Sequence, residues 1–154
     1  MRTESMLKKT FAAMAVLLIA GAAVIAADVD LQDVQCVVAP KAAKADKSAE
    51  YKEGKVYFCC GNCQGKFAKE PKKFAEKANL QLVSTKQYVQ KACPLSGGDI
   101  NPDTAIKVAG AKVAFCCENC QGKVADAEKK EQMKLVFSDK AFEKAFKKAE
   151  PKKE

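Results

Sequence analysis

The chain has 154 residues, a formal net charge of +8 and no histidine. The lack of histidine excludes Cys–His and Ser–His catalytic pairs, and it excludes metal sites that use imidazole. The positive charge is nearly all lysine, with Arg2 as the only arginine, whereas nucleic-acid surfaces usually combine basic side chains, arginine among them, with exposed aromatic residues. We therefore expect neither an enzyme nor a nucleic-acid partner.

The N-terminal residues have the order of a secretory signal peptide. Arg2, Lys8 and Lys9 precede an almost wholly apolar stretch, Phe11 to Ala23, and small residues follow it. We predict a signal peptide over residues 1–27 and an exported protein, periplasmic or secreted, that keeps no membrane contact after cleavage. An uncleaved anchor is the alternative, because the apolar stretch approaches the length of a membrane span.

All eight cysteines belong to one four-thiol spacing that occurs twice, 57 residues apart. The two sets are Cys36, Cys59, Cys60 and Cys63, and then Cys93, Cys116, Cys117 and Cys120. This repetition predicts two small modules, each with its own sulfur site, which we place at residues 28–83 and 84–154. Modules of this size bury little apolar surface, so they usually need disulfides or a metal for stability.

A β-hairpin is expected before the paired cysteines of each module. Alternating apolar residues in Tyr51 to Phe58 predict a hairpin with its turn at Glu53-Gly54. In the second module, Ala105 to Phe115 shows the same alternation around Gly110. The polar stretch from Lys41 to Ala49 is interpreted as a helical turn or a loop.

Helices are expected after the paired cysteines. In the first module we predict a helix over Asn62 to Glu70, a break or restart at Pro71, and a continuation over Lys72 to Ala78. In the second module a single helix is predicted over about Glu118 to Gln132.

The remaining segments are predicted as follows. Leu80 to Val83 and Tyr88 to Ala92 are interpreted as extended. Lys134 to Phe137 occupies a similar position after the helix of the second module. Ser138 is a candidate N-cap for a last helix over Asp139 to Lys148, which belongs to the second module.

The cysteine positions suggest a metal site in each module. Cys59, Cys60 and Cys63 stand where a helix begins, so the helical repeat places them on one face, while Cys36 comes from a separate turn. A helix N-terminus also favours thiolate. A turn or knuckle, a β-hairpin and ligands at the head of a helix make a treble-clef or zinc-ribbon arrangement. We therefore predict an α+β fold of two such modules in tandem.

Thiolate chemistry narrows the choice of metal. Four thiolates in a tetrahedral array suit Zn²⁺, and soft thiolates also suit Cu⁺. We predict one such ion in each module. The candidate ligands are all eight cysteines: Cys36, Cys59, Cys60, Cys63, Cys93, Cys116, Cys117 and Cys120.

The first module contains the pattern Cys36…Tyr51-x-x-Gly54-x-x-Tyr57-Phe58-Cys59-x-x-x-Cys63-x-x-x-Phe67-x-x-x-Pro71. This pattern resembles the YHS and TRASH-like group of metal-binding domains, over roughly Cys36 to Ala78 and again over Cys93 to about Glu128. The resemblance implies a treble-clef-like fold and a role in binding, sensing or trafficking heavy metals. It carries a ligand role to Cys36, Cys59 and Cys63, and to Cys93, Cys116 and Cys120.

The chain departs from that group at the fourth ligand. Many relatives place a second ligand three residues after the first cysteine, where this chain has Ala39 and Ser96. Cys60 and Cys117 are additional thiols, and each is our candidate fourth ligand. A three-coordinate site is the alternative, and it suits Cu⁺ better than structural Zn²⁺.

Two other functions use the same cysteines. A secreted interaction module can be held by disulfides, for example between Cys36 and either Cys59 or Cys63. Cys60-Gly-Asn-Cys63 and Cys117-Glu-Asn-Cys120 are also C-x-x-C pairs at helix starts, but thioredoxin-like redox proteins need a βαβ context. We favour a non-enzymatic metal-binding protein whose expected partner is a metal ion, with another protein as an open alternative.

Overall fold

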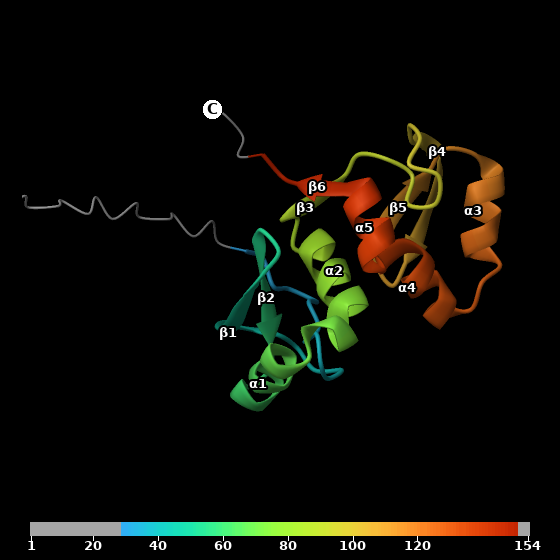
Figure 1. The fold of residues 1–154 in the computed structure, drawn as a ribbon. Coiled ribbons are helices and arrows are strands. Elements are labelled where there is room, and N and C mark those ends of the chain that lie inside the picture. The colour runs from blue at the N-terminus through green and yellow to red at the C-terminus, as the bar shows by residue number, and fades with distance from the viewer. Residues whose placement is uncertain (1–28, 151–154) are drawn as a thin grey trace, which may run out of the picture.

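The structure, a computed structural model, describes residues 29–150, so the predicted signal peptide lies outside the described residues. Two β-hairpins lie towards opposite ends of the molecule, with helices between them (Figure 1). Each hairpin is antiparallel and is followed by a short helix. These elements are β1 (Lys44–Tyr51), β2 (Gly54–Phe58) and α1 (Gly61–Lys69), and then β4 (Asn101–Val108), β5 (Ala111–Phe115) and α3 (Glu118–Ala125).

Helices from both halves of the chain fill the space between the hairpins. The helix α2 packs against α4 and α5, and the short strand β3 pairs antiparallel with β6. These elements are η1 (Pro71–Phe74), α2 (Ala75–Ser84), β3 (Tyr88–Gln90), α4 (Lys129–Phe137), α5 (Asp139–Ala145) and β6 (Phe146–Lys148). Short antiparallel hairpins combined with helices confirm the predicted α+β class.

The two hairpins turn in different ways. Ala109 and Gly110 form the second turn with φ of 50° and 92°, and two positive φ angles are what a type I′ turn requires. The prediction of a turn at Gly110 is confirmed. The first hairpin turns one residue earlier than expected, at Lys52-Glu53, and Gly54 begins β2. Glycine is needed there for close packing, because a Cβ at Gly54 would lie 2.8 Å from the Leu82 side chain.

Two predictions in the first half were wrong. The segment Lys41 to Ala49 is a strand from Lys44 onwards, because Ser48 and Ala49 pair with residues of β2. Leu80 to Val83 is helical rather than extended and belongs to α2. Ala78 and Leu82 lie four residues apart on that helix and are both fully buried, so packing decides the conformation.

Three predictions in the second half also need correction. The single helix expected over Glu118 to Gln132 is divided into α3 and α4, because Glu128 has an extended backbone with ψ of 153°. Lys134 to Phe137 is helical and lies in α4. The last helix ends at Ala145, and the following residues form β6 by pairing with β3.

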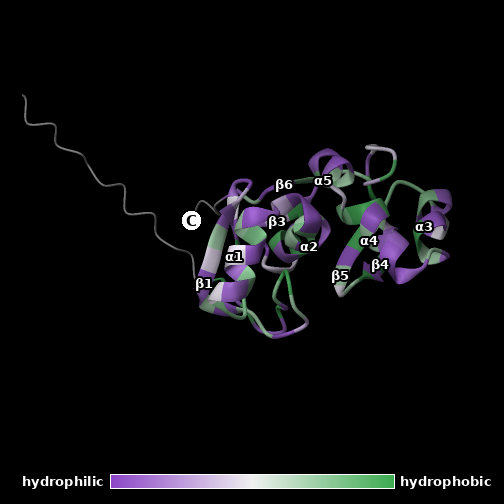
Figure 2. Cartoon of the chain, turned by 60° about the horizontal axis from the view of Figure 1, so that its bottom comes forward, coloured by the Kyte–Doolittle hydropathy of each residue, from purple (hydrophilic) through white to green (hydrophobic). Residues whose placement is uncertain are grey.

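One hydrophobic core extends through both halves of the chain. Phe142 stacks on Phe146 with ring centroids 5.3 Å apart, and Phe137 lies 5.8 Å from Phe146. Tyr88, the first residue of β3, packs on Phe142. In Figure 2 the helices carry both hydrophilic and hydrophobic residues, as amphipathic packing requires. Among the described residues, no helix is long and apolar enough to cross a membrane.

Candidate metal centres

The fold brings together three thiols in each half of the chain. Within each group, all sulfur atoms lie within 4.8 Å of one another. The first cluster is Cys36, Cys59 and Cys63, and the second cluster is Cys93, Cys116 and Cys120. Each cluster can hold a metal ion, and all six residues are those that the sequence pattern assigned as ligands.

The sulfur spacing fits a thiolate metal site. Cys59 Sγ lies 3.6 Å from Cys63 Sγ, and Cys116 Sγ lies 3.6 Å from Cys120 Sγ. Two sulfurs bound tetrahedrally to Zn²⁺ at about 2.3 Å are about 3.8 Å apart. A disulfide needs sulfurs about 2 Å apart, and all eight cysteines are free thiols in the structure.

A closed turn holds the isolated cysteine of each cluster. The backbone N–H of Cys36 donates to Lys41 O at 2.7 Å, and that of Cys93 donates to Gly98 O at 2.8 Å. Gly97 N–H also donates to Cys93 O at 2.8 Å. Cys36 and Cys93 are both buried, so their sulfurs have few alternative positions.

The paired cysteines differ in exposure. The helix α1 begins only at Gly61, and Cys60 is its extended N-cap with φ of −161° and ψ of 164°. Cys59 joins Cys36 and Cys63 in the cluster, while Cys60 is exposed. The predicted common helical face is therefore not how these thiols meet.

The additional thiols lie beside the clusters. Cys60 Sγ is 3.8 Å from Cys59 Sγ, and Cys117 Sγ is 3.7 Å from Cys116 Sγ. Both are exposed, and neither belongs to a group in which every sulfur lies within 4.8 Å of the others. Their role as fourth ligands stays a prediction.

The thiols of the first cluster have divergent acidities. Burial and the neighbouring thiols raise the pKa of Cys63 to about 12. The backbone N–H of Cys63 and nearby thiols lower the pKa of Cys60 to about 7. Burial alone would raise the pKa of Cys36, but the backbone N–H groups of Ala39 and Cys59 bring it below its usual value.

The second cluster repeats this division. Burial and Cys116 raise the pKa of Cys120 to about 12. Burial opposes ionisation of Cys93, yet hydrogen bonds from Ser96 lower its pKa to about 6. Closely spaced thiolates repel one another, and a bound metal cation would offset that repulsion.

A buried glutamine positions the first cluster. Gln81 in α2 accepts a hydrogen bond from Tyr57 N–H at 2.6 Å and donates to Tyr57 O at 3.0 Å. The same amide donates to Gln35 O at 2.8 Å. It therefore joins the residue before Cys36 to the strand that leads to Cys59.

A second glutamine does the same for the second cluster. Gln90 in β3 accepts from Ala114 N–H at 2.9 Å and donates to Ala114 O at 2.6 Å and to Ala92 O at 3.0 Å. Ala92 directly precedes Cys93, just as the partner of Gln81 directly precedes the isolated cysteine of the first cluster. Sequence reasoning missed both glutamines, because the 57-residue offset relates the backbone groups but not the amides that bind them.

One side chain distinguishes the two clusters. Ser96 Oγ donates to Cys116 Sγ at 3.2 Å and accepts from Gly98 N–H at 3.1 Å. The corresponding residue of the first half is Ala39, which has no hydroxyl. The second cluster therefore has a hydrogen-bond donor at a sulfur that the first cluster lacks.

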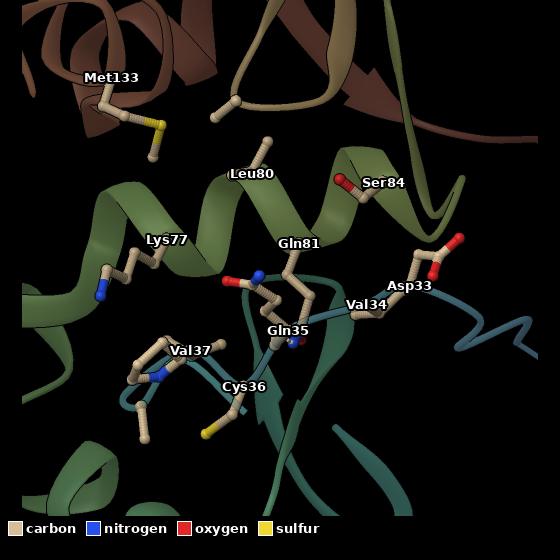
Figure 3. A pocket seen from close by; sticks show the side chains of 13 residues that line it. Asp33, Val34, Gln35, Cys36, Val37, Lys77, Leu80, Gln81, Ser84 and Met133 are labelled. Atoms are coloured by element: carbon tan, nitrogen blue, oxygen red, sulfur yellow. Dashed lines mark hydrogen bonds between the residues drawn. The ribbon is translucent and has the colours of Figure 1, made fainter. Parts of the chain in front are cut away.

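A groove of about 450 Å³ lies behind the first cluster. Figure 3 shows α2 running across it, with Met133 on one side and the turn that carries Cys36 on the other. The Cys36 sulfur points away from α2. Cys36 thus lines the groove, whereas Cys59 and Cys63 do not.

No known protein family, curated protein or solved structure matches the chain. The assignment of candidate metal sites consequently rests on the geometry and chemistry of the thiols.

Proposed function

We propose that the protein binds one soft metal ion, Zn²⁺ or Cu⁺, at each of its two cysteine clusters and acts in heavy-metal binding, sensing or trafficking. The observation that carries this proposal is the convergence of three thiols within 4.8 Å, which occurs twice. Three free thiolates at such distances repel one another, and a soft cation satisfies all of them. The role is that of a binding protein rather than an enzyme.

The resemblance to YHS and TRASH-like domains supports the same role. Each cluster combines a cysteine from a turn with cysteines from the junction of a hairpin and a helix. This is the order of elements in a treble-clef site. Zn²⁺ would need a fourth donor, for which Cys60 and Cys117 are candidates. Cu⁺ would need only the three thiolates of each cluster.

We also propose that the protein works outside the cytoplasm. The basic and apolar order of residues 1–27 supports export. Mass spectrometry of the protein isolated from its producing cells should give a chain that begins near Asp28. A chain that retains Met1 would contradict cleavage.

A metal and thiol count tests the proposed binding. The protein is isolated from its native compartment without oxidant, metal is counted by mass spectrometry, and thiols are counted by alkylation before and after chelation. We expect about one metal ion per cluster and thiols that react only after the metal is removed. Four disulfides without metal would support the disulfide-stabilised module and overturn the metal proposal.

A further inference from the structure

The two cysteine clusters have closely similar frames. In each, the isolated cysteine is buried, and its turn is closed by a backbone hydrogen bond to the residue five positions later. The backbones of Ala39 and Ser96 help to lower the pKa values of Cys36 and Cys93, respectively. The frames therefore allow the two sites to be compared side chain by side chain.

The Ser96 hydroxyl is oriented towards a ligand sulfur. Gly98 N–H donates to Ser96 Oγ at 3.1 Å, and this contact leaves the hydroxyl proton for Cys116 Sγ at 3.2 Å. In the first turn, Lys41 N–H donates instead to the backbone oxygen of Ala39 at 2.8 Å. No side-chain donor reaches a first-cluster sulfur from that position, since alanine has none.

We propose that Ser96 makes the second cluster the tighter of the two metal sites, so that it fills first and releases its metal last. This inference rests on the proposed metal binding. It assigns Ser96 as a positioning residue that acts through Cys116. The protein would then carry one firmly held ion and one that exchanges more readily.

Two physical effects favour the second cluster. The hydroxyl already holds Cys116 in place before metal arrives, so less side-chain freedom is lost on binding. A hydrogen bond to sulfur also strengthens when the sulfur carries thiolate charge, as it does in a metal complex. One hydrogen bond to a charged group produces a difference of about tenfold in affinity.

The test follows the release of Zn²⁺ from both sites in the same molecule. The intact protein is loaded with Zn²⁺ and titrated with a competing chelator, and alkylation of each cysteine is followed by mass spectrometry. We expect Cys36 and Cys63 to become reactive at about tenfold lower chelator concentration than Cys93 and Cys120.

Variants at two corresponding positions assign the effect to the hydroxyl. Ser96→Ala should lower the chelator concentration at the midpoint of Zn²⁺ release from the second cluster to that of the first cluster. Ser96→Thr should restore it. Ala39→Ser is the matched change in the first turn. It should raise the chelator concentration at which the first cluster releases Zn²⁺ towards that of the second cluster. The unaltered cluster is an internal reference that a general loss of stability would also move.

The outcomes separate this inference from the proposed function. If neither cluster is protected by Zn²⁺ or, in a parallel loading, by Cu⁺, metal binding itself fails. If both are protected but release Zn²⁺ at the same chelator concentration, or if Ser96→Ala leaves the ratio of the two midpoints unchanged, the role of Ser96 is overturned while metal binding stands.

Discussion

Neighbouring cysteines in this protein have opposite surroundings. Cys59 lies within 4.8 Å of Cys36 and Cys63 in the cluster, whereas Cys60 is exposed at the N-cap of α1, with its sulfur 3.8 Å from that of Cys59. At the scale of single residues, exposure and distance to the other two sulfurs thus distinguish adjacent thiols.

Substitution of each thiol tests this difference. We expect Cys59→Ser to weaken metal binding at the first cluster by more than roughly 100-fold. Loss of a residue that only hydrogen-bonds to a ligand can already cost about that much. Cys60→Ser should keep one metal ion in that cluster and weaken binding by less than about tenfold. Chelator competition with cysteine-resolved alkylation measures both, and the second cluster serves as the reference.

The opposite result has a definite meaning. If Cys60→Ser abolishes metal at the first cluster, Cys60 is an obligatory fourth ligand, as the cysteine spacing suggested. Cys117→Ser should then have the same effect on the second cluster.

At the scale of elements, a buried glutamine connects a helix to the first cysteine cluster. Gln81 is 3% exposed, and its amide joins α2 to β2 and to the turn before Cys36. Buried backbone groups that lose their partner cost about 1–3 kcal/mol each. Each half of the chain thus relies on one amide to fix the position of its isolated cysteine.

We expect Gln81→Ala to lower the free energy of unfolding by roughly 2–3 kcal/mol, because Tyr57 loses two buried hydrogen bonds and Gln35 loses a half-buried one. Metal affinity should fall about tenfold at the first cluster and stay unchanged at the second. Urea denaturation and chelator competition measure the two effects.

Gln87→Ala is a matched control for this substitution. Gln87 forms the same pair of bonds with the backbone of Lys55, both at 2.7 Å, but these bonds are exposed to solvent. Water can replace them, so the change in stability should be much smaller. Equal losses for Gln81→Ala and Gln87→Ala would contradict the importance of burial.

At the scale of the whole molecule, Asp139 joins the two halves of the chain. It begins α5, and its carboxylate accepts hydrogen bonds from Tyr51 Oη at 3.2 Å and Asn79 Nδ2 at 3.1 Å. Lys52 Nζ lies 3.3 Å from the same oxygen. All three donors come from residues 28–83, so the contacts hold the C-terminal helix against the first half.

This junction makes stability depend on pH. Burial alone would raise the pKa of Asp139, but the Asn79 hydrogen bond and the Lys52 charge hold it below its usual value. A depressed carboxyl pKa in the folded state stabilises the protein above the unfolded pKa of about 3.9, and the contribution is lost as pH falls through the folded value.

We expect Asp139→Asn to cost about 1 kcal/mol at pH 7, a modest figure because solvent screens this half-exposed carboxylate. Below the folded pKa of Asp139 the variant and the native protein should have nearly equal stability. Thermal unfolding from about pH 2.5 to about pH 7 measures the difference in stability between the variant and the native protein. Asp46→Asn is the control, since Asp46 pairs only with its exposed neighbour Lys47, and a similar loss there would contradict the special role of Asp139.

Local patterns in the sequence predicted much of each half of the chain. The alternation around Gly110 and the helix after Cys60 rely on nearby residues, and the structure confirms them. These features follow from turn chemistry and from side-chain periodicity, which a short window of sequence contains.

Contacts between distant segments decided the rest. The strand from Lys44 forms only by pairing with β2, and Phe146 to Lys148 is extended only because β3 lies beside it. Leu82 is helical because that conformation buries it in the core. The division of the chain into residues 28–83 and 84–154 stays a prediction.

The amino-acid sequence by itself determined the two sets of cysteines, because the recurrence of thiols at one offset names the eight residues among which six converge. Only the tertiary structure decided what surrounds them. The glutamine amides, the Ser96 hydroxyl at Cys116 and the exposure of Cys60 depend on backbone directions and on partners far away in the chain. Such contacts have no fixed sequence spacing, since folding rather than periodicity brings their atoms together.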